Sequence, residues 1–304
     1  MTAADSSRWP AVLALVGAPL FWAGHYVVAG AAISETDAWT LSVLRWGGAA
    51  VVLLVVAQLV ERPDWRLVLR RLPRLAVMGL FGMIGFGTLL YLGLESTTAV
   101  NASLVSGIGP VTIAAGAALL LRERLGWRVV LGLVVALVGV LLVVSHGSLD
   151  TFLALRFDTG DLWVIAATVC WSVYTILGRK PIGVPPLTSV GVQAAIVTIL
   201  LLPVLPFAGW HPPQSAAAWW GVAFIILFPS VGSYLLWNYA VRRTPAAVAG
   251  LFLNLIPVFT VILALALGQG VSWPQALGGA IVLGGVLLAT LPGRARGAAG
   301  PSTR

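Results

Sequence analysis

The sequence predicts an all-α integral membrane protein of ten transmembrane helices, built as two inverted five-helix repeats with both termini in the cytoplasm. Hydrophobic residues make up 59% of the 304 positions and charged residues only 9%, and the mean hydropathy is +0.99. Soluble domains carry about 25% charged residues, so this chain could not cover itself with a water-compatible surface. Two further observations support the prediction: the basic residues gather in alternate loops, and landmark residues recur in the same order.

Apolar runs of about 20 residues are typical of helices that cross a membrane. Ten such runs can be counted, and they leave no room for a second soluble domain. We divide the chain into a first repeat (1–145), an outer linker (146–159), a second repeat (160–291) and a cytoplasmic tail (292–304). The expected helices lie near residues 10–30, 39–60, 73–93, 98–121, 127–145, 160–178, 187–208, 216–240, 246–267 and 273–291.

The basic residues predict the orientation of these helices. With a cytoplasmic N-terminus, every Arg and Lys except Arg45 and Arg156 falls in the cytoplasm, as the positive-inside rule expects. We therefore expect a multi-pass protein of the bacterial inner (plasma) membrane. The net charge of +8 then marks topology rather than a nucleic-acid site. The first apolar run is longer and more aromatic than a cleaved signal peptide, so it is retained as a helix.

In the first half, each helix after the first carries a feature beyond its apolar run. The second contains Arg45 about two turns in, and the third places Gly79, Gly82 and Gly85 at three-residue spacing, which permits close helix approach. The fourth contains the polar stretch NASLVSGIGP (101–110) within an apolar run. The fifth lines one face with the small residues Gly132, Ala136 and Gly139.

After the longest loop, the same landmarks return in the same order. Each half has five helices, an odd number, so the second half enters the membrane from the opposite face, an architecture typical of secondary transporters. Chance similarity between two halves rich in Ala, Leu and Val is the alternative, but composition explains matching Trp, Pro and Gly positions poorly. The matched pairs are Trp22 with Trp171, Arg45 with Gln193, Gly85 with Gly232, Thr97 with Thr244, Pro110 with Pro257, Gly132 with Gly278 and Gly139 with Gly285.

Several motifs together carry a family resemblance. They are the five-plus-five helices, a T-x-A…P-V block in each half, Glu123 at the end of the fourth helix, and a G-x6-G-V-L-L ending on the fifth and tenth. With these motifs the chain resembles the EamA-type branch of the drug/metabolite transporter superfamily, whose pattern Arg45 also fits. The second half departs from the family pattern at Gln269, because the ninth helix of family members often ends with an acidic residue. The tryptophan-rich helix starts are similar to those of the YddG-type amino-acid exporters.

Two aromatic helix faces are the candidate walls of a substrate cavity, which the resemblance also implies. The first helix places Trp22, His25 and Tyr26 at i, i+3 and i+4, and the sixth repeats this with Trp171 and Tyr174, so each set shares one face. Aromatic residues near membrane ends are often interface anchors. These tryptophans, however, lie about ten residues into their helices, near mid-bilayer. We expect opposite walls of a central aqueous cavity.

Two further helices add candidate wall residues, for which helix packing is the alternative interpretation. They are Ser233 and Tyr234 of the eighth helix, and Phe86 and Tyr91 of the third. Trp237 and Asn238 continue the polar and aromatic stripe of the eighth helix. We place these last two at the cytoplasmic interface.

Polar residues and prolines interrupt the fourth and ninth helices. Asn101, Ser106 and Asn254 either hydrogen-bond between helices, at about 0.6 kcal/mol each, or help to solvate a substrate. Pro110 and Pro257 each remove a backbone donor and can kink a helix. We expect both prolines to act as hinges on either side of a pseudo-two-fold axis, with the polar residues lining the cavity wall.

Arg45 would be costly in lipid unless it were paired or close to the interface. It lies in the outer part of the second helix, within expected reach of Glu35, Asp37 and Glu95. We expect a structural or gating ion pair, with direct substrate binding as the alternative.

The positions of the carboxylates bear on the energy source. Every Asp and Glu falls in a tail, a loop or a helix end, whereas proton- or sodium-coupled carriers commonly place one in mid-membrane. We expect facilitated efflux, with coupling through His25 as the alternative because histidine titrates near neutral pH. The lone Cys170 excludes a disulfide framework and a cysteine-based metal site, and we expect neither metal nor other cofactor.

These features predict a secondary transporter, not an enzyme, that exports small organic metabolites by alternating access. Aromatic walls with few fixed charges suit apolar and aromatic amino acids, and they also suit flat organic cations held by cation–π contact; a channel is a further alternative. The spans lack the clustered acids of a magnesium-dependent transferase, and the chain lacks a G-x-x-x-x-G-K nucleotide motif. The expected partners are a small-molecule substrate and the lipid bilayer, without nucleic acid. The oligomeric state stays open, and a monomer is compatible with these features.

Overall fold

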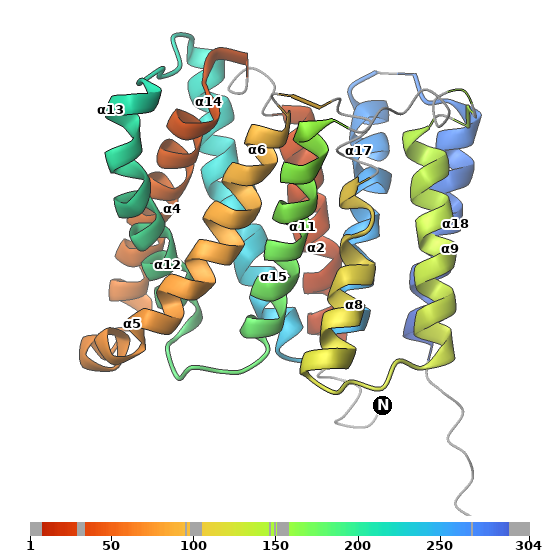
Figure 1. Ribbon diagram of the computed structural model, residues 1–304, viewed down its shortest axis with the longest axis horizontal. Helices are drawn as coiled ribbons and strands as arrows, with labels where there is room; N and C mark the ends of the chain where they lie inside the picture. Colours follow the sequence, from red (N-terminus) through yellow and green to blue (C-terminus); the bar gives the residue numbers. More distant parts are fainter. Residues whose placement is uncertain are drawn as a thin grey trace, which may run out of the picture.

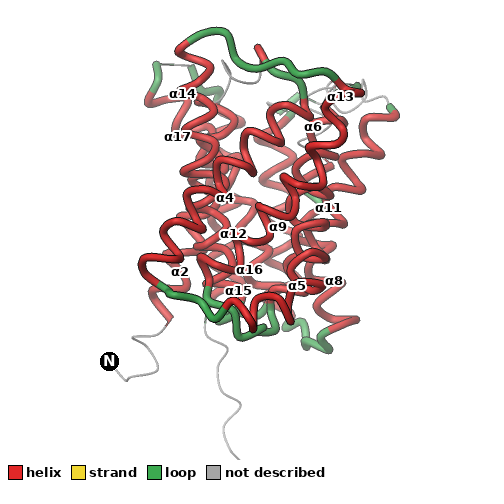
Figure 2. The backbone as a smooth tube through the Cα atoms, turned by 90° about the vertical axis from the view of Figure 1, so that its left-hand side faces the viewer, coloured by secondary structure: helices red, strands yellow, loops and turns green. Residues whose placement is uncertain are grey.

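The computed structural model describes residues 8–28, 34–94, 96–97, 105–145, 147–148, 150, 158–268 and 270–291, with the side chains of residues 8 and 26–28 left aside. Within these ranges all regular secondary structure is helical. The helices stand side by side as a bundle (Figure 1). Loops gather at its two ends when it is viewed from the side (Figure 2).

Helices occupy all five positions predicted for the first half. The third position is one continuous helix that changes to π-helical geometry in the middle and returns to α-helical geometry. The elements are α2 (Arg8–Val28), α4 (Ala38–Val60), α5 (Trp65–Gly79), η1 (Leu80–Thr88), α6 (Leu89–Leu94), α8 (Gly109–Leu120) and α9 (Trp127–Val144).

The second half repeats this series, again with a π-helical segment in its third position. The elements are α11 (Thr159–Gly178), α12 (Pro186–Leu201), η2 (Leu202–Val204), α13 (Leu205–Ala208), α14 (Ala216–Ile225), η3 (Ile226–Gly232), α15 (Ser233–Val241), α16 (Ala246–Leu251), η4 (Phe252–Asn254), α17 (Leu255–Ala266) and α18 (Trp273–Thr290).

Membrane-spanning length is met by eight of the described helical segments, and two more apolar helices, Trp9–His25 and Gly109–Leu120, are shorter. One predicted boundary was wrong, because the third helix begins at Trp65 rather than near residue 73. Asp64 caps this start by accepting hydrogen bonds from the backbone amides of Arg66 and Leu67. Hydropathy misses these first two turns because they contain several arginines, which are polar but are good helix formers.

Each helix contacts partners that have counterparts in the other half. α4 packs on α12, and α9 packs on α18. α2 contacts α15 and α17, while α11 contacts η1, α6 and α8. Exchanging the two halves therefore leaves these particular pairings unchanged.

Glycines bring α9 and α18 into close antiparallel contact. A Cβ atom added to Gly132 would lie 2.6 Å from the carbonyl oxygen of Gly285, and one added to Gly139 would lie 2.6 Å from that of Gly278. Real Cβ atoms do not approach so closely, so these positions require glycine. Each contact joins non-equivalent glycines of the two repeats, as a two-fold relation between antiparallel helices requires.

Departures from regular α-helix also fall at equivalent places in the two halves. The π-helical segments η1 and η3 contain Gly85 and Gly232 respectively, the pair matched in the sequence. In the fourth position a turn at 107–108 precedes α8, and in the ninth the 3-10 segment η4 precedes α17. The predicted interruptions thus exist, and each lies just before its proline.

Most basic residues of the described chain lie at one end of the bundle, the lower end in Figure 1, which we call the basic end. At this end Glu123 accepts hydrogen bonds from the backbone amides at the start of α16 and forms an ion pair with Arg179 at 3.2 Å. Arg179 also donates to the carbonyls of Val241 and Thr244. Glu123 therefore joins the fourth, sixth and ninth helix positions.

Candidate substrate site

Seven aromatic side chains from both halves meet in the middle of the bundle, and we call them the aromatic cluster. All but the half-buried Phe86 are buried. The ring centroids of Trp22 and Trp171 lie 5.1 Å apart with the planes nearly perpendicular. The members are Trp22, Trp46, Phe86, Trp171, Tyr174, Tyr234 and Trp237. The cluster unites five of the predicted wall residues.

The predicted walls touch each other instead of enclosing open water. Edge-to-face packing is a favoured arrangement of aromatic rings, worth about 0.5–1.5 kcal/mol beyond the area that it buries. The indole rings of Trp22 and Trp171 therefore fill the space between α2 and α11 themselves. In this conformation the centre of the protein is closed at the level of the tryptophans.

Sequence reasoning misplaced Trp237 and missed Trp46. Trp237 is fully buried, with its ring 5.7 Å from that of Trp22 and 5.6 Å from that of Trp171. The signal was present, because Trp237 follows Tyr234 by three positions and so shares its helix face. Trp46 contacts the ring of Tyr234 at 5.2 Å.

The π-helical segments supply backbone acceptors to the aromatic cluster. The indole nitrogen of Trp22 donates to the carbonyl of Pro229 in η3 at 3.1 Å, and the hydroxyl of Tyr234 donates to the carbonyl of Gly82 in η1 at 2.5 Å. A π-helical turn interrupts the regular i→i−4 ladder. Each segment thus offers a carbonyl to a side chain from the other half.

Three polar groups within or beside the cluster have no hydrogen-bond partner among the described residues. They are the indole N–H groups of Trp171 and Trp237 and the hydroxyl of Thr175. Buried Trp N–H groups usually find a partner, and each buried polar group without one calls for an explanation. The cluster can therefore donate hydrogen bonds to a bound molecule.

Hydrogen-bonded pairs lie on both sides of the cluster. On one side the hydroxyl of Tyr91 is 3.3 Å from Nε2 of His25. On the other, Asn238 donates its side-chain amide to the hydroxyl of Tyr174 at 2.6 Å and to the carbonyl of Tyr234 at 2.8 Å. The predicted residues His25 and Tyr91 thus lie next to the cluster rather than inside it.

Arg45 is buried on the His25 side of the cluster. Its Nε donates to the hydroxyl of Ser230 at 2.7 Å, its Nη1 donates to the hydroxyl of Tyr91 at 3.2 Å, and its guanidinium lies 4.6 Å from the ring of Trp46. These neutral acceptors and the ring satisfy a buried cation without a carboxylate.

The ion pair predicted between Arg45 and Glu35 or Asp37 does not form. Glu35 accepts hydrogen bonds from the backbone and hydroxyl of Ser215 and from the backbone of Gln214, and these bonds hold the pKa of Glu35 below its usual value. Asp37 caps α4 and lies 3.0 Å from Nδ1 of His211. Both carboxylates therefore form their hydrogen bonds at helix starts and in loops instead of with Arg45. Glu95 lies outside the described residues.

The residues predicted around the helix breaks are described in part. Asn101 lies outside the described residues, as does the side chain of Tyr26. Ser106 is half-buried before the turn that leads into Pro110, and Asn254 is buried in η4 before Pro257. Ser233, predicted as a wall residue, is buried and donates to the carbonyl of Ala18 at 3.0 Å, so it joins α15 to α2.

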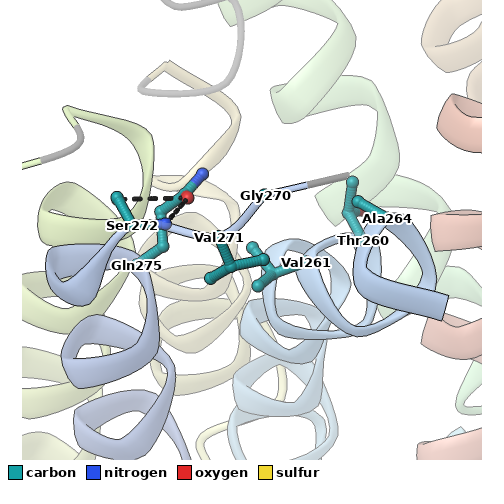
Figure 3. A pocket seen from close by; sticks show the side chains of 7 residues that line it. All are labelled: Thr260, Val261, Ala264, Gly270, Val271, Ser272 and Gln275. Atoms are coloured by element: carbon teal, nitrogen blue, oxygen red, sulfur yellow. Dashed lines mark hydrogen bonds between the residues drawn. The ribbon is translucent and has the colours of Figure 1, made fainter. Parts of the chain in front are cut away.

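A second group of residues lines a pocket between α17 and α18 (Figure 3), where these helices meet at the end of the bundle opposite the basic end (Figure 1). Its volume is about 350 Å³. The amide oxygen of Gln275 accepts from the backbone amide and hydroxyl of Ser272, so this polar pair completes a helix cap. Without charged or unpartnered groups, this pocket offers a polar substrate little. Its lining residues are Thr260, Val261, Ala264, Gly270, Val271, Ser272 and Gln275.

A bundle of membrane-spanning helices with matched halves, and with unpartnered donors at a buried aromatic centre, defines a membrane transporter. Within the described part of the chain, no three His, Cys, Asp or Glu residues lie close enough to hold a metal ion. The chain belongs to the EamA-like transporter family, whose model matches residues 9–145 and 158–291. The resemblance inferred from the motifs is thereby confirmed.

Relatives and a solved structure agree with this assignment. The chain is 32% identical over 271 residues to the uncharacterized transporter YyaM of Bacillus subtilis strain 168, covering 87% of each chain. It is also 32% identical over 305 residues to a probable terminal-alkyne amino-acid exporter of Streptantibioticus cattleyicolor, covering 97% of this chain and 98% of the relative. A solved crystal structure matches with a TM-score of 0.78 and 22% identity over 93% of this chain and 97% of the other, a likeness in fold.

Proposed function

We propose that this protein exports small organic metabolites, chiefly apolar and aromatic amino acids, by alternating access through the aromatic cluster. The observation that carries the proposal is the pair of buried indole N–H groups, on Trp171 and Trp237, that lack acceptors within the described chain. They can bind the carboxylate of an amino acid while neighbouring rings pack on its side chain. The relative named as a probable amino-acid exporter supports this substrate class.

The two halves are inverted repeats, in this proposal, with both termini in the cytoplasm of a bacterium and the chain in its inner membrane. The matched pairings, in which α2 contacts α15 and α17 while α11 contacts α6 and α8, support the repeat. The gathering of arginines at the basic end supports the orientation, because cytoplasmic loops carry an excess of Arg and Lys.

Opening of the site requires Trp22 and Trp171 to separate. The helix breaks before Pro110 and Pro257 lie at equivalent places and leave helix ends that can pivot. Motion at one break would open the cluster to one end of the bundle, and motion at the other break would open it to the opposite end. Both prolines act as hinges in this mechanism.

Transport is facilitated rather than ion-coupled in this proposal. The buried cation Arg45 is satisfied by hydroxyls and a ring instead of a titrating carboxylate. Uptake into vesicles should therefore follow the substrate gradient at constant pH. Uptake driven by a pH gradient, and lost in His25→Ala, would instead establish proton coupling.

Counterflow in proteoliposomes tests the proposal, with labelled phenylalanine and leucine compared against a cationic dye. We expect saturable exchange of the amino acids, and a loss of at least tenfold in Trp171→Ala and in Trp22→Ala. Selective transport of the dye would establish the organic-cation alternative, which cation–π contact with these rings would serve. Flux that does not saturate would identify a channel. Full activity in both tryptophan variants would exclude the cluster as the substrate site.

A further inference from the structure

A second cavity opens at the basic end, next to the aromatic cluster, and we call it the basal pocket. Its volume is about 380 Å³, within the range of sites that hold small molecules. The loop between α11 and α12 forms one side, and the last turn of α15 forms the other. The lining residues are Pro181, Pro186, Asn238, Tyr239, Arg242 and Arg243.

The two arginines of the basal pocket have different surroundings. Arg243 stacks on the ring of Tyr239 at 3.7 Å and donates to the carbonyl of that residue at 2.9 Å, so it completes the end of α15. Arg242 has a buried Nε with no acceptor among the described residues. Helix capping thus explains the position of the Arg243 side chain. The Nε atom of Arg242 has no such structural partner within the described chain.

The electrostatic setting of Arg242 favours an anion. The ion pairs within the described chain are Arg179–Glu123 and His211–Asp37, and neither involves Arg242. Burial lowers the pKa of Arg242 most; the nearby Tyr174 opposes this shift, and the nearby charges of Arg243 and Arg74 add to it. The guanidinium nevertheless stays protonated. A carboxylate in the pocket would restore the lost solvation through charge-assisted hydrogen bonds.

Asn238 connects the basal pocket to the aromatic cluster. It lines the pocket and donates to the hydroxyl of Tyr174 and the carbonyl of Tyr234. The ring of Tyr234 contacts Trp46, and the guanidinium of Arg45 lies over Trp46. A continuous series of contacts therefore leads from one cationic end, at Arg242, to the other, at Arg45.

We propose that the basal pocket is an entry site, where Arg242 binds the substrate carboxylate before the whole molecule moves into the aromatic cluster and the indole N–H groups take the carboxylate over. This inference rests on the proposed function and narrows its substrates to molecules that carry a carboxylate. A cation without a carboxylate meets the positive charges of Arg242 and Arg45, and neither arginine forms an ion pair within the described chain. Amino acids are therefore substrates, and flat organic cations are excluded.

The test compares phenylalanine with phenylalaninamide, which keeps the side chain and lacks the carboxylate. Uptake of both labelled compounds is measured in liposomes containing the full-length protein. We expect the wild type to transport phenylalanine and to transport the amide at least tenfold less efficiently. Arg242→Gln should raise KM for phenylalanine about tenfold, and Arg242→Lys, which keeps the charge, should stay within about threefold of the wild type.

Arg70→Gln is the matched control, because Arg70 is an exposed arginine on α5 at the same end, and it should leave KM unchanged. Phenylalanine transport with an unaltered KM in Arg242→Gln would overturn the pocket assignment and leave the proposed function standing. Equal transport of the amide by the wild type would also overturn it, whether or not the variants fold. Absence of uptake of any amino acid by the wild type would overturn the proposed function, and the pocket assignment with it.

Discussion

The two halves of the chain place hydrogen-bonded pairs at equivalent positions on opposite sides of the aromatic cluster. In the register of the matched tryptophans and glycines, His25 corresponds to Tyr174 and Tyr91 corresponds to Asn238. Both pairs are joined in the structure, His25 with Tyr91 at 3.3 Å and Tyr174 with Asn238 at 2.6 Å. The symmetry thus extends from helix packing to single hydrogen bonds, so a difference between the halves indicates where function requires asymmetry.

The first such difference is a buried charge. Arg45 donates to Ser230 and Tyr91, while its counterpart Gln193 is fully buried and, within the described chain, donates to Ser189 at 3.2 Å. The side-chain oxygen of Gln193 has no partner within the described chain. One half therefore keeps its cation inside the bundle, while the other has a neutral amide there.

Transferring the charge to the second half should have the largest effect. Gln193→Arg places a guanidinium where the hydroxyl of Ser189 is the acceptor that Gln193 uses, without a carboxylate partner within the described chain. The cost is about 2.5–3.5 kcal/mol on insertion scales. We expect a marked fall in melting temperature and in the yield of folded protein, measured by fluorescence-detected size exclusion after heating. Gln193→Leu is the control and should be neutral or stabilising, because it removes an unpaired buried oxygen. A melting temperature unchanged in Gln193→Arg would mean that water reaches this position.

The second difference concerns the paired tryptophans. Trp22 donates to the carbonyl of Pro229, and the equivalent acceptor for Trp171 is the carbonyl of Gly82. The hydroxyl of Tyr234 takes that carbonyl, while the position equivalent to Tyr234 in the first half is a glycine without a side chain. The acceptor equivalent to that of Trp22 is therefore bonded to Tyr234, and the indole N–H of Trp171 has no partner within the described chain.

Removing each indole N–H separately tests this asymmetry. Trp171→Phe should raise KM for phenylalanine about fivefold at nearly constant melting temperature, because its donor is used by the substrate alone. Trp22→Phe should instead lower stability by about 1 kcal/mol and change KM less than twofold, because its donor holds α2 to η3. Transport kinetics and thermal unfolding of both variants provide the measurements. The reverse assignment of effects would refute the proposed roles.

Most of the fold can be predicted because a segment that crosses lipid must satisfy its backbone polar groups internally, and therefore forms a helix. Each long apolar run in the sequence thus predicts one helix. The i, i+3 spacing also identified Trp22 and Trp171 as facing residues. Trp46 escaped notice because α4 is hydrophobic on all sides, so periodicity cannot indicate which face is buried. Trp237 was assigned to the cytoplasmic interface, although its spacing of three residues from Tyr234 places both side chains on one helix face.

The partners of Arg45 could not be predicted for a different reason. Hydropathy does not reveal a π-helical segment, and each such segment changes which residues share a face in the rest of its helix. Tyr91 follows η1, and Ser230 lies within η3. Acidic residues near Arg45 in the sequence were therefore the expected partners of its guanidinium. In the structure the guanidinium instead donates to hydroxyl groups from two other helices.

Tyr234→Phe is the smallest change that should make the two halves more alike. It removes the hydroxyl that occupies the carbonyl of Gly82 and leaves the ring contacts of the cluster in place. The indole N–H of Trp171 can then take that carbonyl, as Trp22 takes its own, and is lost to the substrate. We expect KM for phenylalanine to rise about two- to threefold. The rise should not add to that of Trp171→Phe, because both changes remove the same donor, so additive effects in the double variant would show that Tyr234 acts on the substrate independently of Trp171.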